Sequence, residues 1–239
     1  KPLILSPHEF GIPQERSRVF IPGILESKLN TNKDNINYNF ESFKKELTKN
    51  SFEKFLLKKN IEEKYILKYK KDKYLLNVFN AWAEFILKIK RKNNRTLPVI
   101  WAYEFNKNYN LDHLNPWKKK YIKDMREIYL LNKKFIDKWL KKYDVLNWKK
   151  REQKLEWQAG KDNFNMKDSF IQLRQSGIRC RAKTKFPTLV AMVQIPLIFD
   201  TKYNSWRYLT PRETANLQSF PSNYKIYNEI ENSINNDFE

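Results

Sequence analysis

Apolar residues recur at three- and four-residue steps through two long stretches of this chain, and no other feature of the sequence limits its fold as strongly. This spacing gathers apolar side chains on one face of a helix and leaves Lys and Asn on the exposed faces. It predicts a helix over residues 75–89 and a second one that follows Asn115-Pro116, a helix-start signal, and continues to Tyr143. A polar linker is predicted between them at residues 91–98. The apolar stripes comprise Leu75, Val78, Phe79, Trp82, Phe85, Ile86 and Ile89, then Met125, Ile128, Tyr129, Phe135, Ile136, Trp139, Leu140 and Tyr143.

The sequence changes character after Gly160. Residues 170–199 gain β-branched and aromatic residues in short alternations, interrupted by Gly177, Pro187 and Pro196, and this pattern is typical of short strands. With the helices before it, the pattern predicts a mixed α+β chain. Four tryptophans belong to apolar stripes and are expected in the core rather than on a base-stacking surface: Trp82, Trp101, Trp139 and Trp157.

A short helix is predicted from Thr210 to about Phe220. Thr210 is a suitable N-cap, Pro211 fits the first helical turn, and Glu213 completes a capping box. On its own this stretch could be a well-capped helix with an Arg212–Glu213 surface ion pair.

Charge is concentrated in the middle of the chain. The 239 residues carry a formal net charge of +20, and residues 41–160 hold 31 of the 47 Lys and Arg residues. With 41% hydrophobic residues the chain can bury enough apolar surface to fold, which excludes a disordered polycation. A folded protein of this charge favours a polyanionic partner such as nucleic acid. The abundant Lys and Asn also fit an AT-rich coding sequence, which would enrich lysine whatever the function.

Several classes of site are excluded by residues that the chain lacks. A single cysteine, Cys180, with two separated histidines, His8 and His113, cannot form a disulfide framework or a multi-thiolate zinc site. The four glycines are isolated, so no glycine-rich phosphate loop is present. No run of 18 apolar residues and no signal-peptide pattern occur, so we expect a cytoplasmic protein without membrane association. The first residue is Lys1, which suggests a piece of a longer protein.

Two motifs carry the functional information. In Gly11-Ile-Pro-Gln-Glu-Arg-Ser-Arg-Val-Phe-Ile, the side chains of Gln14, Arg16 and Arg18 would share one side of an extended strand, where guanidinium groups suit phosphate oxygens or a base carbonyl. An edge strand with a solvated basic face is the alternative. The second motif is Tyr208-Leu-Thr-Pro-Arg-Glu-Thr-Ala-Asn-Leu-Gln-Ser-Phe-Pro.

In this order, the two motifs resemble the 5-methylcytosine DNA methyltransferases of bacterial restriction-modification systems. Gln14 to Arg18 is similar to the family's Gln-x-Arg-x-Arg block, and the second motif is similar to its Thr-Pro-Arg-Glu block. Between these blocks the family carries its target recognition domain. Phe186-Pro-Thr-Leu-Val-Ala resembles the Thr-Leu region of that domain, and Arg174-Gln-Ser-Gly-Ile-Arg-Cys-Arg-Ala-Lys resembles its recognition region.

The resemblance implies a division of the chain and a fold. Residues 1–25 would form the Gln-x-Arg-x-Arg strand region, 26–160 a mainly helical basic insert, 161–205 the β-rich target recognition region, and 206–239 the capped helix and C-terminal tail. The fold class expected is an α+β fragment, the small domain of an α/β methyltransferase.

The resemblance also implies an activity for the parent enzyme. A DNA (cytosine-5-)-methyltransferase flips its target cytosine out of the duplex and methylates it with S-adenosylmethionine. The Pro-Cys nucleophile and the cofactor motifs of the family are absent here, and Cys180 between two arginines is expected to be a small buried residue. This chain alone is therefore expected to be inactive and to need a catalytic methyltransferase domain that binds the cofactor.

Double-stranded DNA is the partner that follows from the resemblance. Arg16 and Arg18 are expected at the pocket, with Arg18 at the cytosine carbonyl oxygen. Arginine forks match guanine in the major groove, and we expect recognition on loops spanning residues 174–185 and 188–189. The predicted DNA-binding residues are Gln14, Arg174, Gln175, Ser176, Arg179, Arg181, Lys183, Thr188, Leu189 and Arg212.

Two other interpretations also fit the sequence. The chain could be one subunit of a natural split methyltransferase, or a generic basic helical protein that binds nucleic acid. The second interpretation accounts for the charge but leaves the two motifs unexplained. A DNA methyltransferase part would be cytoplasmic and associated with the nucleoid.

Overall fold

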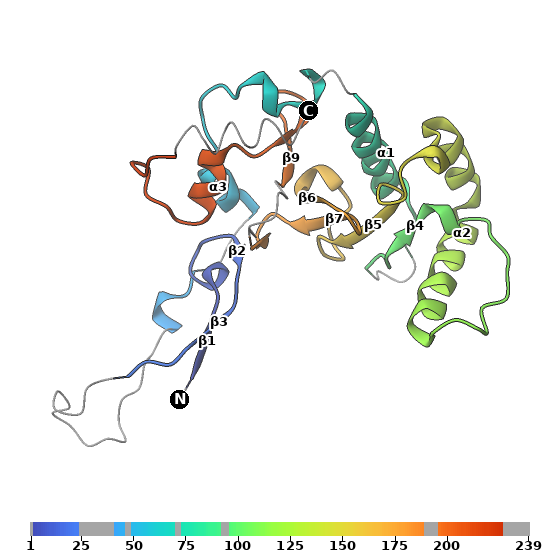
Figure 1. Cartoon of the computed structure of the whole chain (residues 1–239), viewed down its shortest axis with the longest axis horizontal. Helices are drawn as coiled ribbons and strands as arrows, with labels where there is room; N and C mark the ends of the chain where they lie inside the picture. The colour runs from blue at the N-terminus through green and yellow to red at the C-terminus, as the bar shows by residue number, and fades with distance from the viewer. Residues whose placement is uncertain are drawn as a thin grey trace.

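The computed structural model describes residues 2–23, 41–45, 49–69, 73–91, 96–188 and 196–226. Three α-helices and one mixed six-stranded sheet dominate this part of the chain. Figure 1 shows the sheet in the middle, α1 and α2 on one side of it, and α3 with the N-terminal strands on the other. The α+β class predicted from the sequence is confirmed. No helix of the described residues has the length and apolarity needed to cross a bilayer.

The two long helices lie where the apolar spacing predicts them. α1 spans Tyr74–Lys88 and α2 spans Pro116–Tyr143. α2 is kinked at Asn132, whose backbone is non-helical (φ −122°, ψ 16°). The Asn132 amide group compensates for the kink: its oxygen accepts from Lys90 N (2.8 Å), and its nitrogen donates to the carbonyl oxygens of Lys90 (3.1 Å) and Ile128 (2.9 Å). The hydrogen bonds between Asn132 and Lys90 therefore also connect α2 to the segment directly after α1.

The six-stranded sheet has the order β10-β9-β6-β7-β5-β4. Neighbouring strands are antiparallel except β5 and β7, which are parallel. The strands are β4 (Ile100–Trp101), β5 (Lys154–Gln158), β6 (Ser169–Arg174), β7 (Gly177–Ala182), β9 (Leu197–Asp200) and β10 (Ser205–Tyr208).

The division of the chain at residue 160 is a prediction that does not coincide with the sheet. Within the segment 26–160, the described residues form α1 and α2 and also the short strands β4 and β5. β5 pairs with β7 across the predicted boundary, and β10 extends past residue 205. Short strands that pair with distant partners leave only a weak local pattern, which explains why β4 and β5 were missed.

The main core lies between α1 and one face of the sheet. Trp82 is fully buried, packs its ring 5.0 Å from that of Trp139, and donates Nε1–H to the carbonyl oxygen of Glu152 (2.8 Å). Phe79 meets Trp206 of β10 at 5.9 Å. Each such aromatic side chain contributes roughly 2–3 kcal/mol when fully buried. The prediction that the tryptophans belong to the core is confirmed for Trp82, Trp101, Trp139 and Trp157.

The linker predicted at residues 91–98 is described only at 91 and 96–98. Leu97 is buried there, and the Arg91 guanidinium lies over the ring of Phe164 (4.3 Å). These two residues pack against the protein.

A second, smaller core covers one end of the opposite face of the sheet. Phe170 of β6 meets Phe52 of the 3-10 helix η4 (Lys49–Phe55) edge to face at 4.4 Å, and meets Phe186 at 4.8 Å. Leu217 of α3 (Pro211–Leu217) joins this cluster. The predicted capping box of α3 is confirmed, since the Thr210 side chain accepts from Glu213 N (3.2 Å) and Glu213 accepts from Thr210 N (2.9 Å). The helix ends at Leu217, three residues before the predicted end.

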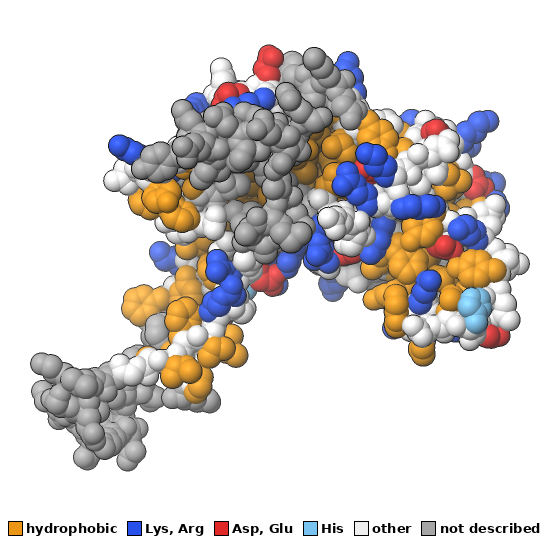
Figure 2. Space-filling model, in the orientation of Figure 1, with side chains coloured by type: hydrophobic (Ala, Val, Ile, Leu, Met, Phe, Trp, Pro, Cys, Tyr) orange, Lys and Arg blue, Asp and Glu red, His pale blue; other side chains and the backbone are white. Residues whose placement is uncertain are grey.

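The N-terminal strands form two separate pairs outside the main sheet. β1 (Leu3–Leu5) pairs antiparallel with β3 (Arg18–Phe20), while β2 (Gln14–Glu15) pairs parallel with β8 (Phe186–Pro187). β1, β3 and the residues up to 23 project from the rest of the protein, and we term this part the N-terminal arm (Figure 1). Figure 2 shows apolar side chains gathered on the arm. Those most exposed are Ile4 (71%), Val19 (61%), Phe20 (50%) and Ile21 (79%).

Candidate nucleic-acid interface

β5, β6 and β7 each turn alternate side chains to opposite faces of the sheet. On the face under α1, Leu155 and Ile178 are fully buried. On the other face, Glu156 of β5 lies directly opposite Arg179 of β7. We term this second face, beyond the end covered by η4 and α3, the polar sheet face. Its residues are Lys154, Glu156, Gln158, Gln172, Arg174, Arg179 and Arg181.

Both arginines of β7 on this face are paired with carboxylates. Arg179 donates Nε–H to Glu156 Oε2 at 2.8 Å, and its Nη2 lies 2.6 Å from the same oxygen. Lys154 Nζ lies 3.1 Å from Glu156 Oε1. Arg181 forms an ion pair with Glu15 of β2 through Nη2. The side chains of Arg179 and Arg181 are 26% and 21% exposed, so neither is fully removed from solvent.

The parallel pair of β2 and β8 brings two distant motifs together. Gln14 lies opposite Phe186 and Glu15 opposite Pro187. The Thr188 hydroxyl then donates to the carbonyl oxygen of Glu15 at 3.0 Å. The Gln-x-Arg-x-Arg block is thereby held beside the predicted Thr-Leu region, about 170 residues further along the chain.

The Gln-x-Arg-x-Arg block is not one continuous strand, because Arg16 and Ser17 separate β2 from β3. The structure thus corrects the expectation of one extended face. Arg16 and Arg18 are exposed, whereas Gln14 is buried, and its Nε2 has no acceptor among the described residues. The turn after β2 is held by Ser6, whose Oγ accepts from Arg16 N at 3.0 Å. Arg18 Nη1 donates to the carbonyl oxygen of Ser17 at 2.7 Å.

The short strands predicted over residues 170–199 are present as β6, β7, β8 and β9, so the recognition region is mainly a hairpin rather than the loops that the resemblance implies. Arg174 ends β6, Gln175 and Ser176 form an exposed two-residue turn, and residues 177–182 form β7 between β6 and β5. The turn lies at the opposite end of β7 from Arg181. Gly177 favours this hairpin because its φ of +138° strains any residue with a side chain. The alternation of polar and apolar residues, which predicts short strands in this part of the chain, is confirmed by β6 and β7.

The remaining predicted residues are dispersed. Lys183 is half-buried in the turn that follows β7. Arg212 on α3 donates to the carbonyl oxygens of Pro221 (3.3 Å) and Tyr224, so it contacts the segment after α3. Leu189 lies outside the described residues.

The Arg212–Glu213 surface pair considered from the sequence does not form. Glu213 is fully buried and pairs with Arg207 of β10 through two hydrogen bonds of 2.8 and 2.9 Å. The Thr-Pro-Arg-Glu block therefore places its carboxylate inside the protein and its arginine outside.

Cys180 lies on the buried face of β7, as predicted for a small core residue. Burial raises the pKa of its thiol far above the ordinary range, and a hydrogen bond with Ser169 acts in the opposite direction. A thiol that stays protonated and buried cannot act as a nucleophile on a base. Among the described residues, no three His, Cys, Asp or Glu side chains gather closely enough to hold a metal ion.

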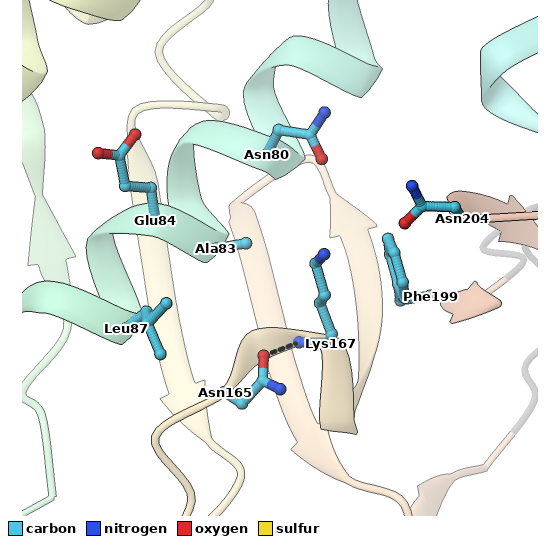
Figure 3. A pocket seen from close by; sticks show the side chains of 8 residues that line it. All are labelled: Asn80, Ala83, Glu84, Leu87, Asn165, Lys167, Phe199 and Asn204. Carbon is cyan, nitrogen blue, oxygen red and sulfur yellow. Dashed lines mark hydrogen bonds between the residues drawn. The ribbon is translucent and has the colours of Figure 1, made fainter. Parts of the chain in front are cut away.

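An open cavity of about 550 Å³ lies beside α1 (Figure 3). Its one carboxylate, Glu84, already accepts from Lys88 (2.7 Å), Lys142 (2.6 Å) and Tyr143 (2.5 Å). No glycine lines the cavity to let a backbone approach a ligand closely. These residues do not fit S-adenosylmethionine. The full lining is Asn80, Ala83, Glu84, Leu87, Asn165, Lys167, Phe199 and Asn204.

Sequence reasoning missed two residues of this interface, Glu15 and Glu156. Each glutamate belongs to the interface because it pairs with an arginine that is distant in the sequence. Glu15 and Arg181 are 166 residues apart, and Glu156 and Arg179 are 23 residues apart. The alternation in Lys154-Leu-Glu-Trp-Gln could have placed Glu156 on a polar strand face, but the parallel partner strand has no local signal.

The comparison with protein families decides the relationship. The C-5 cytosine-specific DNA methylase family matches residues 1–236. The chain belongs to this family. It is also 42% identical over 69 residues to a protein named Type II methyltransferase M.AluI from Cellulosimicrobium cellulans. The matched segment covers 29% of this chain and 12% of that relative. No solved structure matches the chain.

Proposed function

We propose that this chain is the DNA-recognition part of a DNA (cytosine-5-)-methyltransferase of the restriction-modification type, which methylates cytosine in one duplex site with S-adenosylmethionine. The observation that carries the proposal is the pairing of β2 with β8. It supports one continuous surface that runs from Arg16 and Arg18 through Thr188 to Arg179 and Arg181. Such a surface suits a duplex whose cytosine is flipped toward the arginines of the first block.

The residues of this surface would have distinct tasks. Arg18 would hold the carbonyl oxygen of the flipped cytosine, with Arg16 in support, and Gln14 would order the strand beneath them. Thr188 would lie near the backbone of the flipped nucleotide. The other proposed DNA contacts are Arg174, Gln175, Ser176, Arg179, Arg181, Lys183, Leu189 and Arg212.

The transfer step would require the catalytic methyltransferase domain as a partner. The N-terminal arm supports this, because its exposed Ile4, Val19 and Ile21 form an apolar surface on an isolated strand pair. Two strands alone are marginally stable in water, and packing against another domain would stabilise them. The cofactor would be bound by that domain, and this chain alone would be inactive. The same arm favours a natural split enzyme as a second candidate, in which the catalytic part is a separate subunit. The assembled enzyme would act in the cytoplasm at the nucleoid.

A duplex-binding experiment tests the proposal. The full 239-residue chain is titrated with random-sequence duplexes and with libraries of methylation sites over a salt series, beside Arg179→Ala and Lys183→Ala variants. We expect a selected short motif that weakens with Arg179→Ala, and a log K that falls by about 0.9 per log unit of salt for each phosphate neutralised. Lys183→Ala should lower that slope and keep the motif.

The outcomes separate the alternatives. Equal affinity for single strands and duplexes would refute the recognition function and favour a generic basic protein. Steep, sequence-blind duplex binding would mean that base specificity requires the catalytic domain.

A further inference from the structure

Glu156 holds one edge of the Arg179 guanidinium. Its Oε2 meets both Nε (2.8 Å) and Nη2 (2.6 Å), while its Oε1 lies 3.1 Å from Lys154 Nζ. Both carboxylate oxygens are thus engaged by cations from the same face of the sheet. The guanidinium edge formed by Nε and Nη2, which we term the inner edge, is therefore fixed by Glu156. The edge formed by Nη1 and Nη2 is termed the outer edge.

The outer edge of the same guanidinium is available. Nη1 and the second hydrogen of Nη2 point away from the Nε side, and Nη1 forms no hydrogen bond with any described residue. The Arg179 side chain is 26% exposed, and Nη1 is not among the buried side-chain atoms without a partner in the described residues. Two parallel N–H groups at this edge match O6 and N7 of guanine in the major groove.

The surroundings keep the carboxylate charged and in place. Burial alone raises the pKa of Glu156, but hydrogen bonds from Arg179 and Lys154 hold the pKa below its ordinary value. Lys154 reaches the carboxylate across Gly177, where an added Cβ would lie 3.0 Å from the Lys154 side chain. The glycine therefore leaves the space that the lysine occupies.

We propose that Glu156 is a positioning residue for base specificity, which fixes Arg179 so that its outer guanidinium edge reads a guanine. The inference rests on the proposed function, since it requires that the polar sheet face contacts DNA. A fixed arginine loses less conformational freedom on binding and rejects bases that do not offer two acceptors. Glu156 itself would not touch the base.

The experiment compares variants of the full chain for binding to duplexes that differ at each position of the selected site. Arg179→Lys keeps the charge but removes the two parallel N–H groups of the guanidinium. At one position of the site, the ratio of affinities for guanine and for the other bases should therefore fall by about tenfold or more. Glu156→Gln keeps the shape and should weaken the same preference about threefold or more, because it loses the charge-assisted hydrogen bond. Glu156→Gln should also leave affinity for random DNA equal or higher, since a negative charge is removed.

Two controls separate positioning from other roles. Glu63→Gln changes the net charge equally at an exposed residue of the 3-10 helix η5 (Glu63–Tyr65), and it should leave the preference unchanged. In the Arg179→Lys background, Glu156→Gln should have no further effect on the preference, since the two residues act through one contact. Melting temperatures of all variants show whether a lost preference reflects unfolding.

The failures are distinguishable. A selected motif that Arg179→Lys relaxes and Glu156→Gln leaves intact would overturn the positioning role and keep the proposed function. If the Glu156→Gln variant instead loses a preference for cytosine at another position of the DNA site, Glu156 contacts a base directly. That result would also overturn the positioning role. Duplex binding without any selected motif overturns the inference alone, whereas no preference for duplex DNA refutes the proposed function as well.

Discussion

At the scale of single residues, Glu213 is the side chain on which we expect the fold to depend most. It is fully buried and accepts hydrogen bonds from Leu57 N (3.0 Å), from Thr210 N (2.9 Å) and from two nitrogens of Arg207 (2.8 and 2.9 Å). The carboxylate therefore joins α3 to β10 and to the chain after η4. Arg207, with 1% of its side chain exposed, has Asp200 as its other acidic partner.

Replacing Glu213 by Ala should destabilise the protein by about 3–5 kcal/mol, because a buried guanidinium loses its main partner and two backbone N–H groups lose their acceptor. Urea unfolding followed by circular dichroism measures the change. The neighbouring Arg212→Ala is the matched control and should cost less than about 1 kcal/mol, since Arg212 bonds only to exposed carbonyl oxygens. Equal costs for the two variants would contradict the role assigned to Glu213.

Of the interactions that Glu213 makes, the local sequence predicts the capping box and not the ion pair with Arg207. The pattern Thr-Pro-Arg-Glu predicts the capping box correctly, because its two hydrogen bonds join residues three apart. The pattern contains no information on Arg207, which approaches from the strand before the helix, and the exposed pair of Arg212 and Glu213 was therefore the natural expectation. Burial decides between the two arginines, and burial depends on the packing of α3 onto the sheet.

At the scale of elements, Glu84 connects the two long helices. Hydrogen bonds from Lys142, Lys88 and Tyr143 lower the pKa of Glu84 to about 2. A carboxyl group with a lowered pKa stabilises the fold above its unfolded pKa, and this contribution is lost as the pH falls from about 5 toward 2. Because Glu84 is partly exposed, we expect about 1 kcal/mol at neutral pH.

Glu84→Gln should remove that contribution at pH 7 and make the stability less steep between pH 5 and pH 2. Unfolding by urea at a series of pH values measures both effects. Glu63→Gln, at an exposed residue, provides the comparison and should leave the pH profile of the parent protein unchanged. A Glu84→Gln profile that coincides with the parent profile would show that the carboxylate does not link α1 to α2.

The helices were predictable and the sheet was not, for a physical reason. A helix is closed by hydrogen bonds between residues four apart, so the stripes of residues 75–89 and 125–143 are sufficient to locate α1 and α2. The pairing of β5 with β7, and of β2 with β8, is decided by contacts between residues far apart in the chain. The arginines of the candidate site could be named from the sequence, but the carboxylates that orient them could not.

At the scale of the whole molecule, the N-terminal arm extends away from both cores and leaves its apolar side chains exposed (Figure 2). Residues exposed in this way contribute little to the stability of the chain itself, so their substitution by a charged residue should change the free energy of unfolding by less than about 0.5 kcal/mol. Burying a charge in an interface with another domain would be far more costly. A charged substitution in the arm can therefore test for an interface with another domain without unfolding the chain itself.

Ile21→Lys, at a residue that is 79% exposed, should leave the melting temperature of the chain unchanged and its duplex affinity equal or higher. When the parent chain is mixed with a catalytic methyltransferase domain, we expect methyl transfer, measured by incorporation of labelled methyl groups into duplex DNA. The Ile21→Lys variant should fail to support this transfer. Leu130→Lys makes the same change at a residue of α2 that is 70% exposed, and it should keep transfer intact. Equal transfer with both variants would show that the arm is not the surface that receives the catalytic domain, while loss with both would indicate a general effect of the added charge.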